Sequence, residues 1–79
     1  MKYDDKKILL TELAKRVKTL REEKGLTQEE CLNDTGISFS RIEQCKRDIS
    51  FTTLHKICIY FNISFNDFFE GYFNSMESK

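Results

Sequence analysis

The sequence predicts an all-α protein, and three observations carry that prediction. Apolar residues return every three or four positions along most of the chain, which is the spacing of a helix with one buried face. Serine or threonine stands just before several of these stretches, where a side-chain oxygen can cap the first N–H groups of a helix. Proline is absent, and no alternating pattern competes as a strand. The 79 residues are too few for more than one domain of ordinary size, so we expect a single domain over residues 1–79.

The first predicted helix runs from about Asp5 to Lys24. Its buried face is marked by a set of aliphatic residues at helical spacing, namely Leu10, Leu13, Val17 and Leu20. Gly25 follows the last polar turn, where a residue with positive φ commonly ends a helix.

Two short helices separated by a tight turn are predicted next. Thr27 and Glu30 form a capping-box pattern at the start of the first of them. This helix ends near Thr35, and Gly36 can adopt the positive φ that the turn requires. Ser38 then caps a further helix. This layout is typical of a helix-turn-helix, in which the second helix enters the major groove of DNA.

The helix that begins at Ser38 has an apolar and a polar side. Phe39 and Ile42 face inward at i and i+3, which leaves Ser40, Arg41 and Gln44 outside. Arginine reads guanine, glutamine reads adenine, and serine binds bases or phosphates, so this polar side suits groove contact. An ordinary solvated helix face is the alternative interpretation. Lys46 and Arg47 follow directly and suit phosphate contact, the alternative being that they merely balance Glu43 and Asp48.

Two more helices are predicted in the C-terminal half. One begins near Ser50 or Thr52 and has an apolar stripe made of Leu54, Ile57, Cys58 and Phe61. Ile63 turns inward in a short loop. Ser64 caps the last helix, in which Phe65, Phe68 and Phe69 recur at helical spacing.

The aromatic residues of this half exceed the needs of one small core. Phe61, Phe65 and Phe68 can fill it, which leaves Phe69, Tyr72 and Phe73 as a candidate homodimer interface. The alternative is that they pack against the start of the first helix at Ile8 and Leu9. The tail over residues 74–79 is polar, and fraying is expected there.

Charge and cysteine content limit the possible function. Thirteen basic and thirteen acidic residues cancel, but residues 1–24 hold eight Lys or Arg against five Asp or Glu, so a basic side is possible. An odd number of cysteines argues against a disulfide framework and favours a cytosolic protein. No stretch is apolar and long enough to span a membrane, and no secretory signal is visible.

No catalytic or metal-binding pattern is visible. His55 and Cys58 share a helix face, but there is no second histidine and no CxxC pair. Cys31 and Cys58 stand at core positions. Cys45, beside two cations, is the one candidate for a reactive thiol, although a structural role is the simpler interpretation. We therefore expect no enzymatic activity, cofactor, metal or small-molecule ligand.

Two motifs resemble the Cro and phage-repressor helix-turn-helix family, often called Xre-like. They are LREEKGLTQEE at residues 20–30 and RIEQCKRDIS at residues 41–50, and the segment 54–69 resembles the closing part of the same domain. The resemblance covers about residues 10–70. It implies a compact, lambda-repressor-like domain of five helices that binds operator DNA, usually as a two-fold dimer.

The resemblance also implies roles for particular residues. It implies that Gln28 contacts the DNA backbone and sometimes a base. It also implies that the loop after the third helix contacts phosphates. It pairs Arg21 with Glu43 in an ion pair between the first and third helices. The residues that it assigns to DNA are Gln28, Ser38, Ser40, Arg41, Lys46 and Arg47.

The chain departs from the family pattern at three places. The segment from Ser38 to Arg41 is about three residues shorter, at the helix end where base contacts concentrate. Cys45 replaces the usual glycine, which requires either a different cap or positive φ at a cysteine. Ile49 replaces the usual proline. The predicted function is a DNA-binding transcriptional regulator that acts as a homodimer. The alternative is a protein-interaction module, antitoxin-like or anti-repressor, that keeps the fold without reading DNA.

Overall fold

The computed structural model describes residues 3–71, with side chains described from residue 5. Over that range the chain forms five helices and no strand. The all-α prediction is therefore confirmed, and each expected helix is present within a few residues of its expected bounds. The helices are α1 (Tyr3–Glu23), α2 (Gln28–Thr35), α3 (Phe39–Glu43), α4 (Phe51–Phe61) and α5 (Phe65–Phe69).

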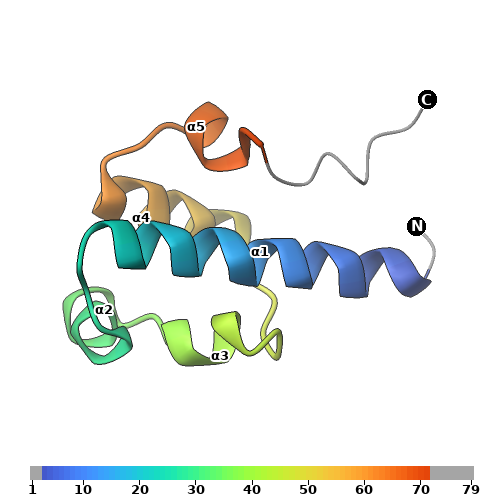
Figure 1. Cartoon of the computed structure of the whole chain (residues 1–79), viewed down its shortest axis with the longest axis horizontal. Coiled ribbons are helices and arrows are strands. Elements are labelled where there is room, and N and C mark those ends of the chain that lie inside the picture. Colours follow the sequence, from blue (N-terminus) through green and yellow to red (C-terminus); the bar gives the residue numbers. More distant parts are fainter. Residues whose placement is uncertain (1–2, 72–79) are drawn as a thin grey trace.

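The long helix α1 is the axis around which the others are arranged (Figure 1). In this view α2 and α3 lie below α1, whereas α4 and α5 lie above or behind it. The C-terminal end of α1 is beside α2, and its N-terminal turns extend past the end of α3 (Figure 1). Helix α3 packs directly on α1 and α2, so the polar side of α3 faces away from the body of the protein.

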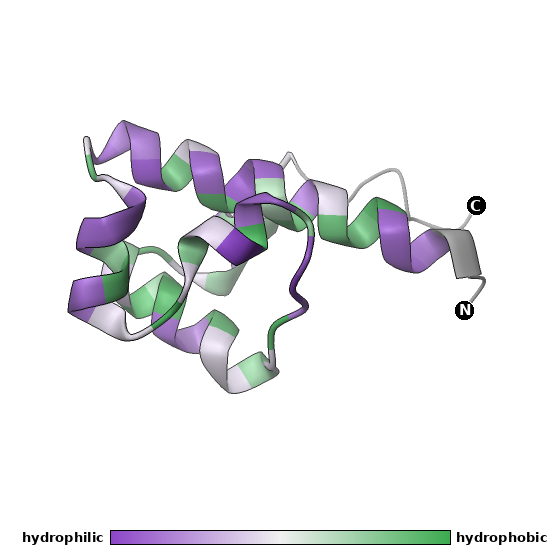
Figure 2. Cartoon of the chain, turned by 90° about the horizontal axis from the view of Figure 1, so that it is seen from below, coloured by the Kyte–Doolittle hydropathy of each residue, from purple (hydrophilic) through white to green (hydrophobic). Residues whose placement is uncertain are grey.

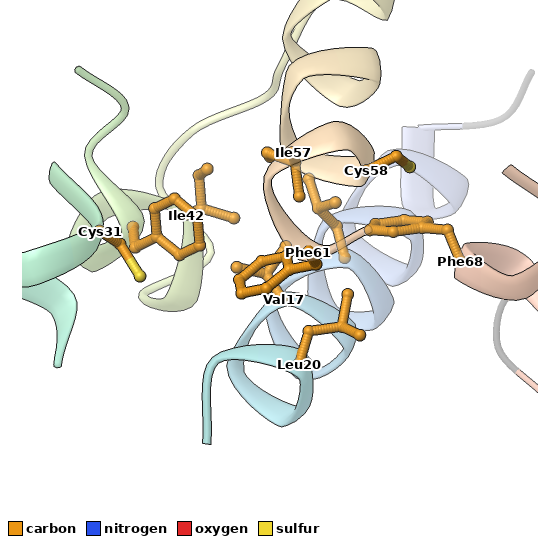
Figure 3. Packing of buried hydrophobic residues seen from close by; sticks show 10 residues of the cluster. Val17, Leu20, Cys31, Ile42, Ile57, Cys58, Phe61 and Phe68 are labelled. Atoms are coloured by element: carbon orange, nitrogen blue, oxygen red, sulfur yellow. The ribbon is translucent and has the colours of Figure 1, made fainter. Parts of the chain in front are cut away.

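The core lies where α1, α3 and α4 meet, and aromatic rings dominate it (Figure 3). Phe39 packs edge-on against Phe61 with ring centroids 5.9 Å apart, and both rings are at most 1 % exposed. Cys31 and Cys58 are buried in the same cluster, as the sequence predicted. Burial raises the pKa of both thiols, so neither is suited to act as a nucleophile.

The expected place of Phe65 in the core is only partly correct. Its ring is half-buried at the edge of the core, with Phe51 at 5.3 Å and His55 at 5.8 Å between ring centroids. Phe51 itself is 73 % exposed. The aromatic cluster therefore continues from the core onto the surface of α4 rather than ending inside the protein.

Side-chain caps begin four of the helices. Thr27, Ser38, Ser50 and Ser64 each accept a hydrogen bond from the backbone N–H three residues later. Thr27 also completes the predicted capping box, since the Glu30 carboxylate accepts from the Thr27 N–H at 2.8 Å. Ser50, rather than Thr52, is thus the residue that starts α4. These caps satisfy N–H groups that otherwise have no partner in the helix.

Residues with positive φ end the helices, and one of them is a cysteine. Cys45 has φ of 61°, in the left-handed region where a side chain is disfavoured. Its N–H donates to Ile42 O at 3.0 Å, and the Lys46 N–H donates to Arg41 O at 3.1 Å. This is the Schellman pattern that glycine usually completes. Of the two outcomes that the sequence allowed, the cap is retained and Cys45 takes the strained conformation.

Helix α5 is held by an arginine from α1. Arg16 Nε donates to the carbonyl of Phe68, and another guanidinium nitrogen donates to the carbonyl of Asp67, both at 2.7 Å. The guanidinium also lies 5.8 Å from the centre of the Phe68 ring. A cation at the C-terminal end of a helix satisfies carbonyls that lack partners and suits the helix dipole. Arg16 therefore fixes α5 on the far side of α1 from α3.

The strain at Cys45 leads to a prediction. Cys45→Gly should raise the free energy of unfolding by about 1 kcal/mol, because glycine adopts positive φ without a Cβ clash. Denaturant unfolding measures the change. Cys45→Ala removes the thiol but keeps the Cβ, so it should bring no gain. An equal gain in both variants would show that the thiol, not the backbone, causes the strain.

Candidate nucleic-acid interface

A largely buried ion pair joins α1 to α3. Arg21 Nε donates to Glu43 Oε2 at 2.8 Å, and a second guanidinium nitrogen donates to Glu43 Oε1 at 2.9 Å. The side chains are only 13 % and 5 % exposed, so the pair is largely shielded from water. The hydrogen bonds that Arg21 donates to Glu43 raise the pKa of the Arg21 guanidinium above its ordinary value. The structure thus forms the pair that the family resemblance implied.

The same carboxylate also holds the start of α2. Gln28 Nε2 donates to Glu43 Oε1 at 3.0 Å, and Arg21 reaches the Leu26 carbonyl at 2.9 Å. Glu43 therefore receives three hydrogen bonds from two different helices. Sequence reasoning did not identify this role of Gln28. Its amide nitrogen has a second N–H, which the hydrogen bond to Glu43 leaves available for a phosphate.

The polar side of α3 faces away from this network. Phe39 and Ile42 are at most 1 % exposed, and they fix which side of the short helix points outward. Arg41 is exposed, and its side chain makes no hydrogen bond or ion pair with any residue that the structure describes. The remaining polar residues of α3 are oriented by local bonds. Gln44 Nε2 donates to Ser40 Oγ at 3.1 Å, and Ser38 Oγ accepts from the Arg41 N–H at 3.4 Å.

Basic residues continue this surface beyond α3. The left-handed turn at Cys45 redirects the chain, and the exposed Lys46 and Arg47 follow it. Seen from the α3 side, α2 lies to one side of α3 and the hydrophilic loop of Lys46 and Arg47 to the other (Figure 2). A shallow hollow of about 240 Å³ separates the starts of α2 and α3, with Gln28, Ser38 and Ser40 along it.

The structure therefore gathers the seven predicted DNA-contact residues onto one side of the protein. Of the three predicted dimer residues, the structure describes only Phe69. Phe69 lies on α5, 42 % exposed, with its ring 5.3 Å from the buried Phe68 ring. Tyr72 and Phe73 lie outside the described residues.

A tyrosine fixes the other end of α2. Tyr60 on α4 donates its hydroxyl proton to Asp34 Oδ2 at 2.7 Å. This hydrogen bond is the largest cause of a pKa for Tyr60 that is raised well above its ordinary value. Helix α2 is thus tied at its start to α3 through Gln28, and at its end to α4 through Asp34. The spacing of α2 and α3 depends on both attachments.

The buried ion pair leads to a stability prediction. Glu43→Gln should lower the free energy of unfolding by about 2–3 kcal/mol, because the shielded Arg21 charge loses its counter-charge. Glu29→Gln, an exposed change on α2, should stay within about 0.5 kcal/mol of the parent. Urea unfolding of both variants tests this. Equal stabilities would mean that the pair contributes nothing net.

Tyr60 leads to a pH-dependent prediction. In the unfolded chain Tyr60 loses its proton near pH 10, before it does in the folded protein, where the pKa is raised. Its contribution to stability is therefore complete below about pH 9 and falls as the pH rises beyond about 10. Tyr60→Phe should be less stable by about 1 kcal/mol at pH 8, and that gap should narrow at high pH. A gap that stays constant from pH 8 to 11 would contradict the hydrogen-bond account.

Comparison with known proteins agrees with this geometry. The model of one protein family, the Cro/C1-type HTH DNA-binding domain, matches residues 3–73. No curated protein and no solved structure is significantly similar to the chain. No described helix is long and apolar enough to cross a membrane. The match covers all five helices and both halves of the helix-turn-helix, and the chain belongs to the Cro/C1-type helix-turn-helix DNA-binding family.

Proposed function

We propose that this protein is a transcriptional regulator that binds duplex DNA with sequence specificity through α3. One observation carries the proposal. Arg41 is exposed and has no partner among the described side chains, on a helix whose other side is fixed by a buried ion pair. The backbone of α3 is fixed, and the unpaired guanidinium is available for a bidentate contact with guanine, the commonest specific contact in the major groove.

Each surrounding group has a part in this mechanism. Helix α3 enters the major groove with Arg41 and the paired Ser40 and Gln44 toward the base edges. Lys46 and Arg47 contact phosphates on one side of the groove. Gln28, through its second amide N–H and the nearby N-terminus of α2, contacts the backbone on the other side. These phosphate contacts set the register in which Arg41 meets the bases.

The length of α3 limits what one copy can read. Five residues at 1.5 Å each give about 7.5 Å of helix, which spans only two or three base pairs at 3.4 Å per step. Specific binding by so short a helix needs two half-sites. We propose a homodimer built on Phe69, Tyr72 and Phe73, which reads half-sites roughly 34 Å apart. Phe69 supports this because a large ring is 42 % exposed on α5, away from α3.

A protein-interaction module is the second candidate. The brevity of α3 and the zero net charge of the chain favour it. The two functions differ in their dependence on salt. Phosphate contacts release counterions, so binding to mixed-sequence duplex should weaken steeply as salt rises if the regulator account holds. A protein that binds no duplex at low salt would be an interaction module instead.

Arg41 and Lys46 should differ in their effect on binding. Arg41→Ala should weaken binding to a duplex selected from a random pool by about 1–3 kcal/mol and leave binding to random duplex nearly unchanged. Lys46→Ala should weaken both by a similar factor, because phosphate contacts are blind to sequence. Fluorescence anisotropy of the parent and both variants with the two duplexes measures the six affinities. Equal losses on both duplexes for Arg41→Ala would refute its role in base reading.

A further inference from the structure

The N-terminal turns of α1 carry cations beside the loop that follows α3. Lys6 and Lys7 are both exposed, and they line an open cavity of about 510 Å³ together with Leu10, Thr11 and Cys45. Cys45 is the residue directly before Lys46 and Arg47. The start of α1 is thus adjacent to the basic loop, although about 40 residues separate them in the chain.

Lys7 lies on the side of α1 that faces α3, and Lys6 lies about 100° around the helix from it. At 100° per residue Lys7 lies close to the direction of Ala14 and Arg21, which contact the body of the protein or Glu43. Farther along the helix this side is covered by α3. Over the first turns α1 extends past the end of α3 (Figure 1). There it carries Lys7, which lines the cavity beside Leu10.

Charge is separated along the molecule. Around the projecting start of α1 and the loop, the described charged side chains are Lys6, Lys7, Lys46 and Arg47, with Asp5 and Asp48 as the acids. The Asp48 carboxylate accepts from the Ile49 N–H at 2.8 Å. The opposite end of α1 and the start of α2 carry Glu22, Glu23, Glu29 and Glu30 against the exposed Lys24. A chain with no net charge therefore presents one basic end.

From these observations we propose that Lys6 and Lys7 form a second phosphate-binding site, which contacts the DNA backbone beyond the segment read by α3. The inference rests on the proposed DNA-binding function. The dimensions allow it, because the major groove is about 8.5 Å deep and packed helices lie about 8–10 Å apart. When α3 enters the groove, the flanking backbone rises to nearly the level of α1. Long lysine side chains cover the remaining gap.

The expected partner surface follows from Figure 2. Viewed from the α3 side, the loop of residues 45–48 lies beside α3, and the N-terminal turns of α1 extend farther in the same direction. The two lysines would therefore bind the same backbone edge as Lys46 and Arg47, displaced outward along it. Such contacts are blind to sequence, so they raise affinity without altering which bases are read.

The salt dependence of binding tests this proposal. With a labelled mixed-sequence duplex, the slope of log affinity against log salt should become shallower by about 0.9 for Lys6→Ala, by the same for Lys7→Ala, and by about twice that for both together. Lys15→Ala on the same helix is the matched control, because its ammonium lies 3.9 Å from Glu12 and does not line the cavity. It should leave the slope unchanged. The double variant Lys6→Arg/Lys7→Arg keeps both positive charges, so it should have the same slope as the parent.

The outcomes separate this proposal from the DNA-binding function itself. If the parent binds with a steep slope that Lys6→Ala/Lys7→Ala does not alter, the second site is wrong and the function stands. If the control flattens the slope as much as the test variants, the effect is one of overall charge and the second site is again wrong. If the parent binds no duplex, the second site and the proposed DNA-binding function are both wrong.

Discussion

The ion pair between Arg21 and Glu43 is the constraint on which the rest of the interface depends. A helix of five residues has too few internal hydrogen bonds to be stable alone, so tertiary contacts must hold α3 in place. Phe39 and Ile42 fix which side of α3 faces inward, and the bidentate pair fixes the last turn of α3 against α1. Because Glu43 also accepts from Gln28, one carboxylate sets the positions of both helices of the helix-turn-helix.

The candidate interface is positively charged although the whole chain has no net charge. Burying Glu43 with Arg21 removes a carboxylate from the surface that faces phosphate, where it would repel DNA. Five of the described acids lie around α2, and exposed cations follow α3 and begin α1, although other exposed lysines lie elsewhere on α1 and α4. Net charge is consequently a poor guide to function for this protein. What matters for a polyanionic partner is the field over one face, and that field depends on which charges the fold pairs and buries.

Much of the fold could be predicted from the sequence because its signals are local. The N-caps at Thr27, Ser38, Ser50 and Ser64 act within one turn, and helical periodicity identified the core. Other features could not be read in this way. The bonds from Gln28 to Glu43 and from Tyr60 to Asp34 join residues 15 and 26 positions apart, and several polar partners were equally plausible. Helical periodicity also does not show whether the Phe65 ring lies in the core or beside Phe51 at its edge, because both positions agree with the spacing of apolar residues.

The most direct test of the central claim, that the outer side of α3 meets duplex DNA while the ion pair holds its inner side, is an amide chemical-shift titration with a selected duplex. The account predicts that the largest changes fall at residues 38–47 and at the start of α2, and that core amides such as those of Ile57 and Phe61 move little. Changes concentrated on α4 and α5, with residues 38–47 unaffected, would contradict it.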